Sequence, residues 1–252
     1  MDEIVSALRD QLDELSGLLA DRDEADFALP TPGCPGWTVA DVVLHLAQTD
    51  EFAIASAEGR IPEGPANLAG PTAPVEAVDD TAALMVERER GKPAAEVRDR
   101  WQASADTLVA VLDATDPHTR VQWVAGQLSA RTLATTRISE TWIHTGDVAE
   151  AFGIELAPTD RLRLIARLAW RTIPYAFDRA GRELHGPVAF ELQSPSGEQW
   201  SFRPDDDPVT VIRGDALELC LVAAQRLDPA DSGLRGEGRD ADAVLELVRT
   251  FA

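Results

Sequence analysis

The spacing of apolar residues changes from a helical to a strand period after about residue 179 of this chain, and that change is the strongest constraint on its fold. Near the start, Leu8, Leu12 and Leu15 recur every three or four positions, which is the period of an amphipathic helix. Helical spacing continues to about residue 179, whereas residues 188–213 alternate apolar with polar side chains, as strands do. A helical region followed by a stranded one predicts an α+β protein.

Four main helices are expected in the N-terminal part, the number found in a helix bundle. Thr38 stands three residues before Asp41, which is the spacing of a capping box and predicts the start of the second helix. Gly153 is placed to end the fourth helix. Residues 59–74 are rich in Pro, Gly and Ala and predict a long connection, either a crossover or a lid over a site. The expected helices cover residues 1–20, 38–57, 79–112 with a break at Gly91-Lys92-Pro93, and 129–152.

The C-terminal part is expected to form a short antiparallel sheet with helices. The turn sequence Ser194-Pro195-Ser196-Gly197 separates two alternating runs and predicts a hairpin. A third strand is expected at 209–213. Because the pattern changes near 153–158, we expect a bundle domain at 1–155 and a smaller α+β domain at 156–252. Further helices are expected at 160–179, through 217–222 and at 240–252.

The charge balance excludes some classes of partner. The chain has 44 acidic against 23 basic residues, a formal net charge of −21, without a compensating run of basic residues. Such a surface repels phosphate groups, so neither nucleic acid nor an anionic membrane is an expected partner. A small-molecule substrate fits better, and the protein is expected to be a monomer or a homodimer.

Cysteine usage and the N-terminal sequence suggest a cytoplasmic protein. The two cysteines, Cys34 and Cys220, lie in regions of different pattern, and nothing in the sequence indicates a disulfide between them. The N-terminus lacks the positive charge and apolar run of a signal peptide, and no apolar stretch reaches membrane-spanning length.

Three side chains on two expected helices are candidate metal ligands. Glu140 and His144 are four residues apart, so they lie on the same face of one helix. His45 lies on an otherwise apolar face of the second expected helix. A buried ionisable group is costly without a partner, and a metal would satisfy all three. Two histidines and one carboxylate also leave coordination positions open, as catalytic sites do.

The same spacing has simpler readings. A Glu and a His four residues apart can be a pair on a helix surface, and His45 can be a hydrogen-bonded core histidine. Asp147, three residues after His144, could orient the imidazole or be a solvated charge. Cys34 has neither a helix start nor a basic neighbour evident in the sequence that would activate its thiol, which favours an unreactive role.

Two segments resemble the mycothiol-dependent maleylpyruvate isomerase family of the DinB-like metal-dependent superfamily. They are residues 35–46, PGWTVADVVLHL, and residues 140–147, ETWIHTGD. The resemblance implies a four-helix bundle that holds a divalent metal, usually zinc. It also implies that His45, Glu140 and His144 are the metal ligands.

Residues 214–226 resemble the C-terminal segment of the same family, which ends in a basic residue facing the site. The resemblance implies that Arg226 binds a carboxylate of the substrate or of the thiol cofactor. The family often has Gly before this Arg, whereas this chain has Gln225. The alternative for Arg226 is a cation placed favourably at a helix C-terminus.

The activity implied by the resemblance is isomerisation of, or thiol transfer to, a small electrophilic carboxylate. The metal would activate mycothiol or a similar thiol, and the resulting thiolate would attack the substrate. Two alternatives stay open at this point. One is a metal-dependent isomerase, cyclase or lyase without a thiol; the other is a non-catalytic, metal-containing ligand-binding protein.

Overall fold

The computed structural model describes residues 1–60, 75–124 and 126–250. The chain divides into two compact units, Met1–Leu156 and Ala157–Phe251. The expected α+β class is confirmed, with a helical N-terminal unit and a smaller C-terminal unit that contains a sheet. Nearly all of the long connection expected at 59–74 lies outside the described residues, so its interpretation as a crossover or lid stays a prediction.

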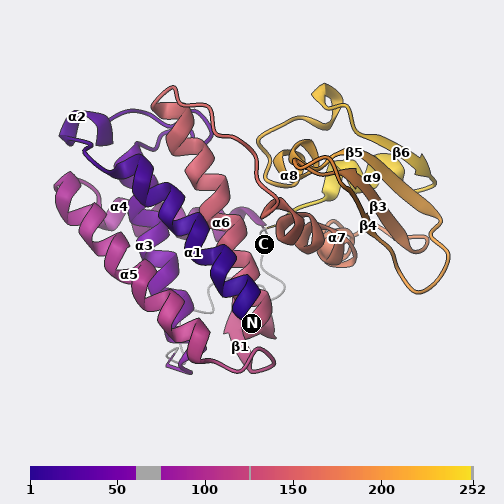
Figure 1. Ribbon diagram of the computed structural model, residues 1–252, viewed down its shortest axis with the longest axis horizontal. Helices are drawn as coiled ribbons and strands as arrows, with labels where there is room; N and C mark the ends of the chain where they lie inside the picture. The colour runs from indigo at the N-terminus through magenta and orange to yellow at the C-terminus, as the bar shows by residue number, and fades with distance from the viewer. Residues whose placement is uncertain (61–74, 125, 251–252) are drawn as a thin grey trace. The chain divides into compact units, whose positions relative to one another are not determined.

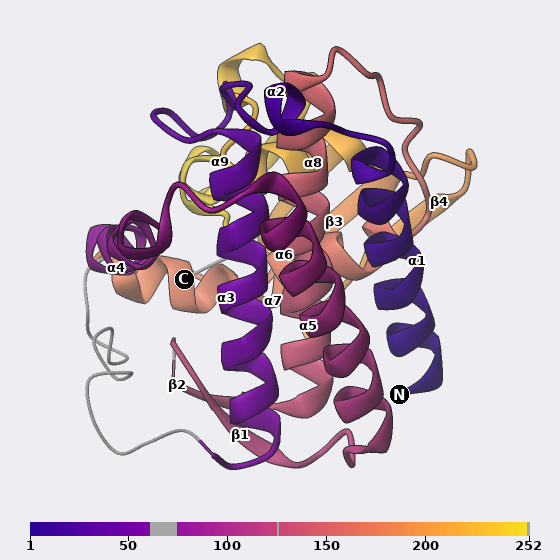
Figure 2. The same ribbon diagram turned by 90° about the vertical axis from the view of Figure 1, so that its left-hand side faces the viewer.

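Long helices running alongside one another form the N-terminal unit (Figures 1 and 2). Smaller elements surround them: the short α2, the helix α4 and a hairpin of two strands. The hairpin was not expected, because its strands are only four residues long and their side chains do not alternate cleanly in burial. The long helices are α1 (Asp2–Leu19), α3 (Val39–Ala57), α5 (Ala94–Ala114) and α6 (Ala130–Ala151), and the others are α2 (Glu24–Phe27), α4 (Val75–Glu89), β1 (Arg120–Trp123) and β2 (Gly126–Ser129).

Local capping fixes where the helices that carry the candidate ligands begin and end. The capping box expected at Thr38 is confirmed: its backbone N–H donates to Asp41 Oδ2 at 2.9 Å, and its hydroxyl accepts from the Asp41 N–H. Ser129 caps α6 by accepting from the backbone N–H of Thr132. Gly153, with φ 65°, follows the last turn of α6 as expected. These caps place His45 in the second turn of α3.

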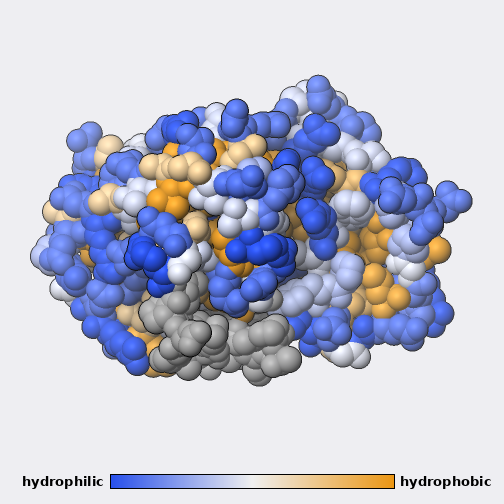
Figure 3. Space-filling model, turned by 90° about the horizontal axis from the view of Figure 1, so that it is seen from below, coloured by the Kyte–Doolittle hydropathy of each residue, from blue (hydrophilic) through white to orange (hydrophobic). Residues whose placement is uncertain are grey.

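The bundle core is apolar, and its surface is mainly hydrophilic. The largest fully buried side chains include Leu8 and Leu15 on α1, Leu44 on α3 and Trp101 on α5. Each such side chain contributes about 1.5–3 kcal/mol when removed from water. Hydrophilic residues predominate in the described part of the face shown in Figure 3, which draws the whole molecule, in line with the high net charge. Among the described residues, none of the helices combines the length and apolarity needed to cross a membrane.

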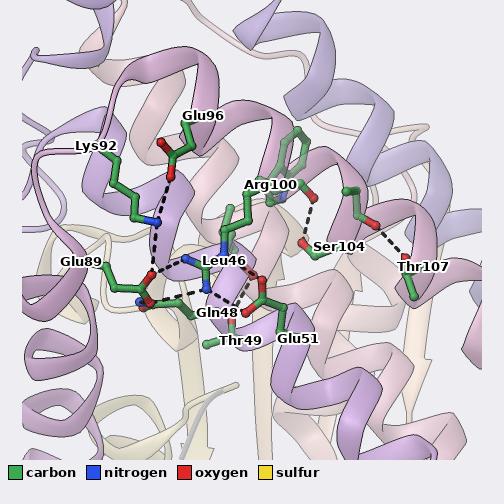
Figure 4. Close-up of polar contacts among 12 residues, drawn as sticks. Leu46, Gln48, Thr49, Glu51, Glu89, Lys92, Glu96, Arg100, Ser104 and Thr107 are labelled. Carbon is green, nitrogen blue, oxygen red and sulfur yellow. Dashed lines mark hydrogen bonds and ion pairs between the residues drawn. The ribbon is translucent and has the colours of Figure 1, made fainter.

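An ion cluster at the surface joins α3, α4 and α5 (Figure 4). Arg100 on α5 donates to Glu51 on α3 at 2.8 Å and to Glu89 on α4 at 2.7 Å. Lys92 bridges Glu89 and Glu96. Because these side chains remain partly exposed and are screened by solvent, the pairs add little to the stability of the fold.

The C-terminal unit has a four-stranded sheet with strand order β4-β3-β5-β6. The expected hairpin is confirmed as β3 paired antiparallel with β4. One detail differs from expectation: β3 and β5 are parallel, so the sheet is mixed rather than antiparallel. After β4 the chain crosses to the opposite edge of β3, where β5 pairs with it. Just before β5, the Val209 N–H donates to the carbonyl of Pro187, the residue that precedes β3. The elements are α7 (Leu162–Arg179), β3 (Val188–Gln193), β4 (Gln199–Phe202), β5 (Thr210–Asp215), α8 (Ala216–Ala223), a 3₁₀ turn (Pro229–Asp231), β6 (Arg235–Gly238) and α9 (Ala241–Leu247).

The last strand and helix differ most from the expected pattern. Strand β6 was not expected, because all four of its residues are exposed and two of them are glycines, so its sequence shows no alternation of apolar and polar side chains. A side chain at Gly238 would overlap the backbone of β5, so the close approach of these strands requires glycine there. Helix α9 ends at Leu247 instead of continuing to 252. Beyond it, Thr250 N–H donates to the Ala223 carbonyl and the Arg249 carbonyl accepts from Thr172.

The end of α8 contains an unfavourable backbone conformation that a substitution should relieve. Gln225 has φ 58°, and the Arg226 N–H donates to the Leu221 carbonyl at 2.8 Å, which together form a Schellman motif. Because a side chain in this conformation costs about 1–2 kcal/mol, part of it offset by the entropy of glycine, we expect Gln225→Gly to stabilise the protein by about 0.5–1 kcal/mol. Urea unfolding measures the change. Ala224→Gly is the control: its φ of −86° is right-handed, so it should destabilise, and a loss of stability in Gln225→Gly would contradict the prediction.

Candidate metal centre

The three predicted ligands converge between α3 and α6. His45 comes from α3, and Glu140 and His144 come from one face of α6. His45 Nε2 lies 2.9 Å from Glu140 Oε1, and His144 Nε2 lies 3.7 Å from the same oxygen. The two imidazole rings meet edge to face, with centroids 5.1 Å apart. One ligand atom from each residue lies within 4.8 Å of the others, so the three side chains share one small volume.

Burial and mutual hydrogen bonding set the charges in this cluster. Burial lowers the pKa of His45 more than the adjacent Glu140 raises it. Burial opposes ionisation of Glu140, but hydrogen bonds with His144 and His45 outweigh it and hold the pKa of Glu140 well below its usual range. A neutral imidazole and an ionised carboxylate are the forms that bind metals.

The pKa of His144 is shifted in the opposite direction to that of His45. Burial disfavours the His144 cation, yet hydrogen bonds with Asp147, Cys34 and Glu140 outweigh this and raise its pKa well above the usual value. In the imidazolium form, the proton on Nε2 would occupy the position that a metal would take. A metal would displace this proton, because a cation and a proton compete for the same lone pair.

Asp147 orients the imidazole of His144. Asp147 Oδ2 lies 2.8 Å from His144 Nδ1, so Nδ1 is assigned as the donor and Nε2 faces Glu140. Metal-binding histidines usually donate their second nitrogen to a carboxylate in this way. The sequence left open whether Asp147 orients His144 or is a solvated charge. The geometry supports orientation of His144.

Cys34 also lies at the centre, which sequence reasoning missed. Its thiol donates to Asp147 Oδ2 at 3.2 Å and lies 3.9 Å from His144 Nδ1. Cys34 precedes the start of α3 in a turn, where helical periodicity gives no information about direction. The only signal was its position four residues before the capping box. Trp37, from the same turn, packs against His45 with ring centroids 5.2 Å apart.

Arg226 belongs to the C-terminal unit. It follows the left-handed Gln225 beyond α8, and its Nη1 donates to the Ala224 carbonyl at 3.2 Å. The N-terminal unit therefore assembles the predicted metal ligands from its own helices. The role of Arg226 in binding a carboxylate stays a prediction.

The donor set suits a divalent cation. Two imidazole nitrogens and one carboxylate oxygen are ligands that zinc accepts, and protein sites with three such ligands keep a position open for water or substrate. Glu140 is the most accessible of the three, with 23% of its side chain exposed, whereas His45 and His144 are buried. The carboxylate of Glu140 is therefore the part of the cluster most open to solvent.

Comparison with known proteins gives one family and one fold. Residues 8–149 match the family model of the mycothiol maleylpyruvate isomerase N-terminal domain. Uncharacterized proteins from two strains of Mycobacterium tuberculosis, CDC 1551 / Oshkosh and ATCC 25618 / H37Rv, are each 34% identical over 98% of this chain and 95% of their own. A crystal structure of the mycothiol-dependent maleylpyruvate isomerase has a similar fold, with a TM-score of 0.59, 20% identity and 95% of each chain covered. The crystal structure of a histidine-to-alanine mutant of that isomerase also has a TM-score of 0.59, with 19% identity and 95% of each chain covered.

Proposed function

This chain belongs to the mycothiol maleylpyruvate isomerase family, and we propose that it is a metal-dependent, thiol-using enzyme. Its substrate is a small electrophilic carboxylate, which it isomerises or joins to mycothiol or a similar thiol. The observation that carries the proposal is the convergence of His45, Glu140 and His144. Family membership supplies the thiol and the class of reaction.

We propose that His45, Glu140 and His144 hold the metal, and that zinc is the ion. A divalent cation bound there would act as a Lewis acid that lowers the pKa of a thiol and makes a thiolate available near neutral pH. His45 and Glu140 already favour the protonation states that ligands need. Asp147 keeps the Nε2 atom of His144 directed toward Glu140.

We propose that Arg226 binds a carboxylate of the substrate or of the thiol. A guanidinium group can donate two parallel hydrogen bonds to a carboxylate, and it stays charged at all relevant pH values. The Schellman motif at the end of α8 fixes the backbone from which Arg226 extends. Isomerisation and thiol transfer need the same groups up to this point.

The activity test uses maleylpyruvate, the substrate in the name of the family, with metal-free and zinc-reconstituted protein. We expect conversion to the trans isomer, or accumulation of a thiol adduct, only when both zinc and mycothiol are present. Chromatography with mass detection distinguishes the two products. Turnover that persists without thiol would replace this proposal by thiol-independent metal catalysis. Stoichiometric metal without turnover of any small unsaturated carboxylate would point to a binding protein.

A further inference from the structure

A fully buried ion pair joins the two helices that carry the candidate ligands. Arg137 on α6 is 1% exposed and Asp50 on α3 is 0% exposed. Arg137 Nη2 lies 2.8 Å from Asp50 Oδ1, and Arg137 Nε donates to the same oxygen at 3.0 Å. Arg137 precedes Glu140 by three residues, a rise of about 4.5 Å along the helix, so the pair lies one turn from the cluster.

A continuous set of hydrogen bonds connects this pair to His45. Arg137 Nη2 donates to Thr49 Oγ1 at 3.0 Å, and the Thr49 hydroxyl donates to the His45 carbonyl at 2.9 Å. One guanidinium on α6 therefore contacts two consecutive residues of α3. Through Thr49 it reaches the backbone of a predicted ligand.

Stability alone does not account for a pair in this position. Buried ion pairs often stabilise a fold no more than apolar residues of similar volume, because both charges lose their hydration. Here the compensation is incomplete: within the described part of the chain, Asp50 Oδ2 has no hydrogen-bond partner. Burial raises the pKa of Asp50 to about 6 even though Arg137 opposes the shift.

The pair restrains the position of α3 relative to α6. Apolar side chains tolerate small rotations and translations of one helix against another, whereas the two hydrogen bonds and the ion-pair contact that Arg137 makes with Asp50 and Thr49, at 2.8–3.0 Å, depend on both distance and direction. His45 Nε2 and Glu140 Oε1 lie 2.9 Å apart. A displacement of α3 relative to α6 by about 1 Å would therefore break this contact, because hydrogen bonds between N and O extend only to about 3.2 Å.

We propose that Arg137 and Asp50 are positioning residues that fix the register of α3 against α6 and thereby bring His45 to Glu140 and His144. The inference rests on the proposed metal site. Arg137 and Asp50 would support that site by holding its two helices in place, without contact with the metal.

The test separates metal affinity from stability. The double variant Arg137→Met, Asp50→Leu replaces the pair by apolar side chains of similar size. We expect its metal-free form to unfold at a urea midpoint no lower than that of the wild type. We expect its affinity for Co²⁺, followed by visible absorption, to fall about 10- to 100-fold, the range of changes to residues that support metal ligands. Arg100→Met, which removes the surface ion pairs of Arg100 with Glu51 on α3 and Glu89 on α4, is the control and should bind Co²⁺ as the wild type does.

Each result decides the proposal. Wild-type affinity in the double variant would show that the pair has no positioning role. If the wild type itself binds no Co²⁺, the metal site is wrong and the positioning role falls with it, which distinguishes the two failures. If the double variant does not fold, Arg137→Lys decides, because it keeps the charge and loses the forked geometry. Weaker Co²⁺ binding at unchanged helix content, by circular dichroism, supports the proposal, and unchanged affinity overturns it.

Discussion

We expect the purified protein to carry about one divalent metal ion per chain, and His45→Ala and His144→Ala to lose it. Either substitution leaves only two protein ligands, one of them the carboxylate of Glu140. The expected loss of affinity is more than about 100-fold, beyond the range seen when only a supporting residue is changed. Elemental analysis after dialysis against a weak chelator measures the bound metal.

The chain provides a matched control for this measurement. His118 is exposed and lies in the loop before β1, so His118→Ala removes an imidazole without affecting the cluster. It should keep the wild-type metal content. Stoichiometric metal in both His45→Ala and His144→Ala would rule out the proposed ligand set. Metal lost equally from all three variants would indicate adventitious binding to histidine.

Much of the helical fold could be predicted because the signals are local. Apolar residues at a period near 3.6, the capping box at Thr38 and the glycine at 153 are properties of single segments. Strand β6 could not be predicted in this way. Its pairing with β5 depends on glycines that let two backbones approach, and a glycine has no side chain to show a pattern.

The candidate site could be predicted only in part, for a related reason. The Glu140/His144 pair lies on one helix, so its spacing gives its geometry. Pairing with His45 depends on packing between helices, which the sequence indicated only indirectly, by an ionisable residue on an apolar helix face and by the family resemblance. Cys34 lies in a turn, where no periodicity gives the direction of a side chain. Arg137 precedes Glu140 by one turn of the same helix, but nothing in the sequence identifies Asp50 as its partner.

We expect Arg137→Met alone to lower the free energy of unfolding by about 3–5 kcal/mol, the cost of removing one partner of a buried ion pair. The substitution nearly preserves volume but leaves the Asp50 carboxylate buried without its cation. Arg100→Met is the same substitution at a site with equally short contacts, 2.7–2.8 Å, and should cost less than about 1 kcal/mol. The difference arises from exposure, because the Arg100 side chain is 25% exposed and that of Arg137 is 1% exposed.

The loss of stability in Arg137→Met should depend on pH, and the pKa of Asp50 determines whether the loss grows or shrinks as the pH rises. Its pKa is about 6 in the folded protein, above its ordinary value, so folding takes up a proton and stability from this group rises as the pH falls. Without Arg137, which lowers that pKa, the folded value rises further. The variant should therefore be most destabilised near pH 8 and should recover toward the wild type near pH 5.5, where Asp50 is protonated. Urea unfolding of both proteins at the two pH values measures this, and a defect that stays constant or grows toward pH 5.5 would show that loss of packing, not the stranded carboxylate, causes it.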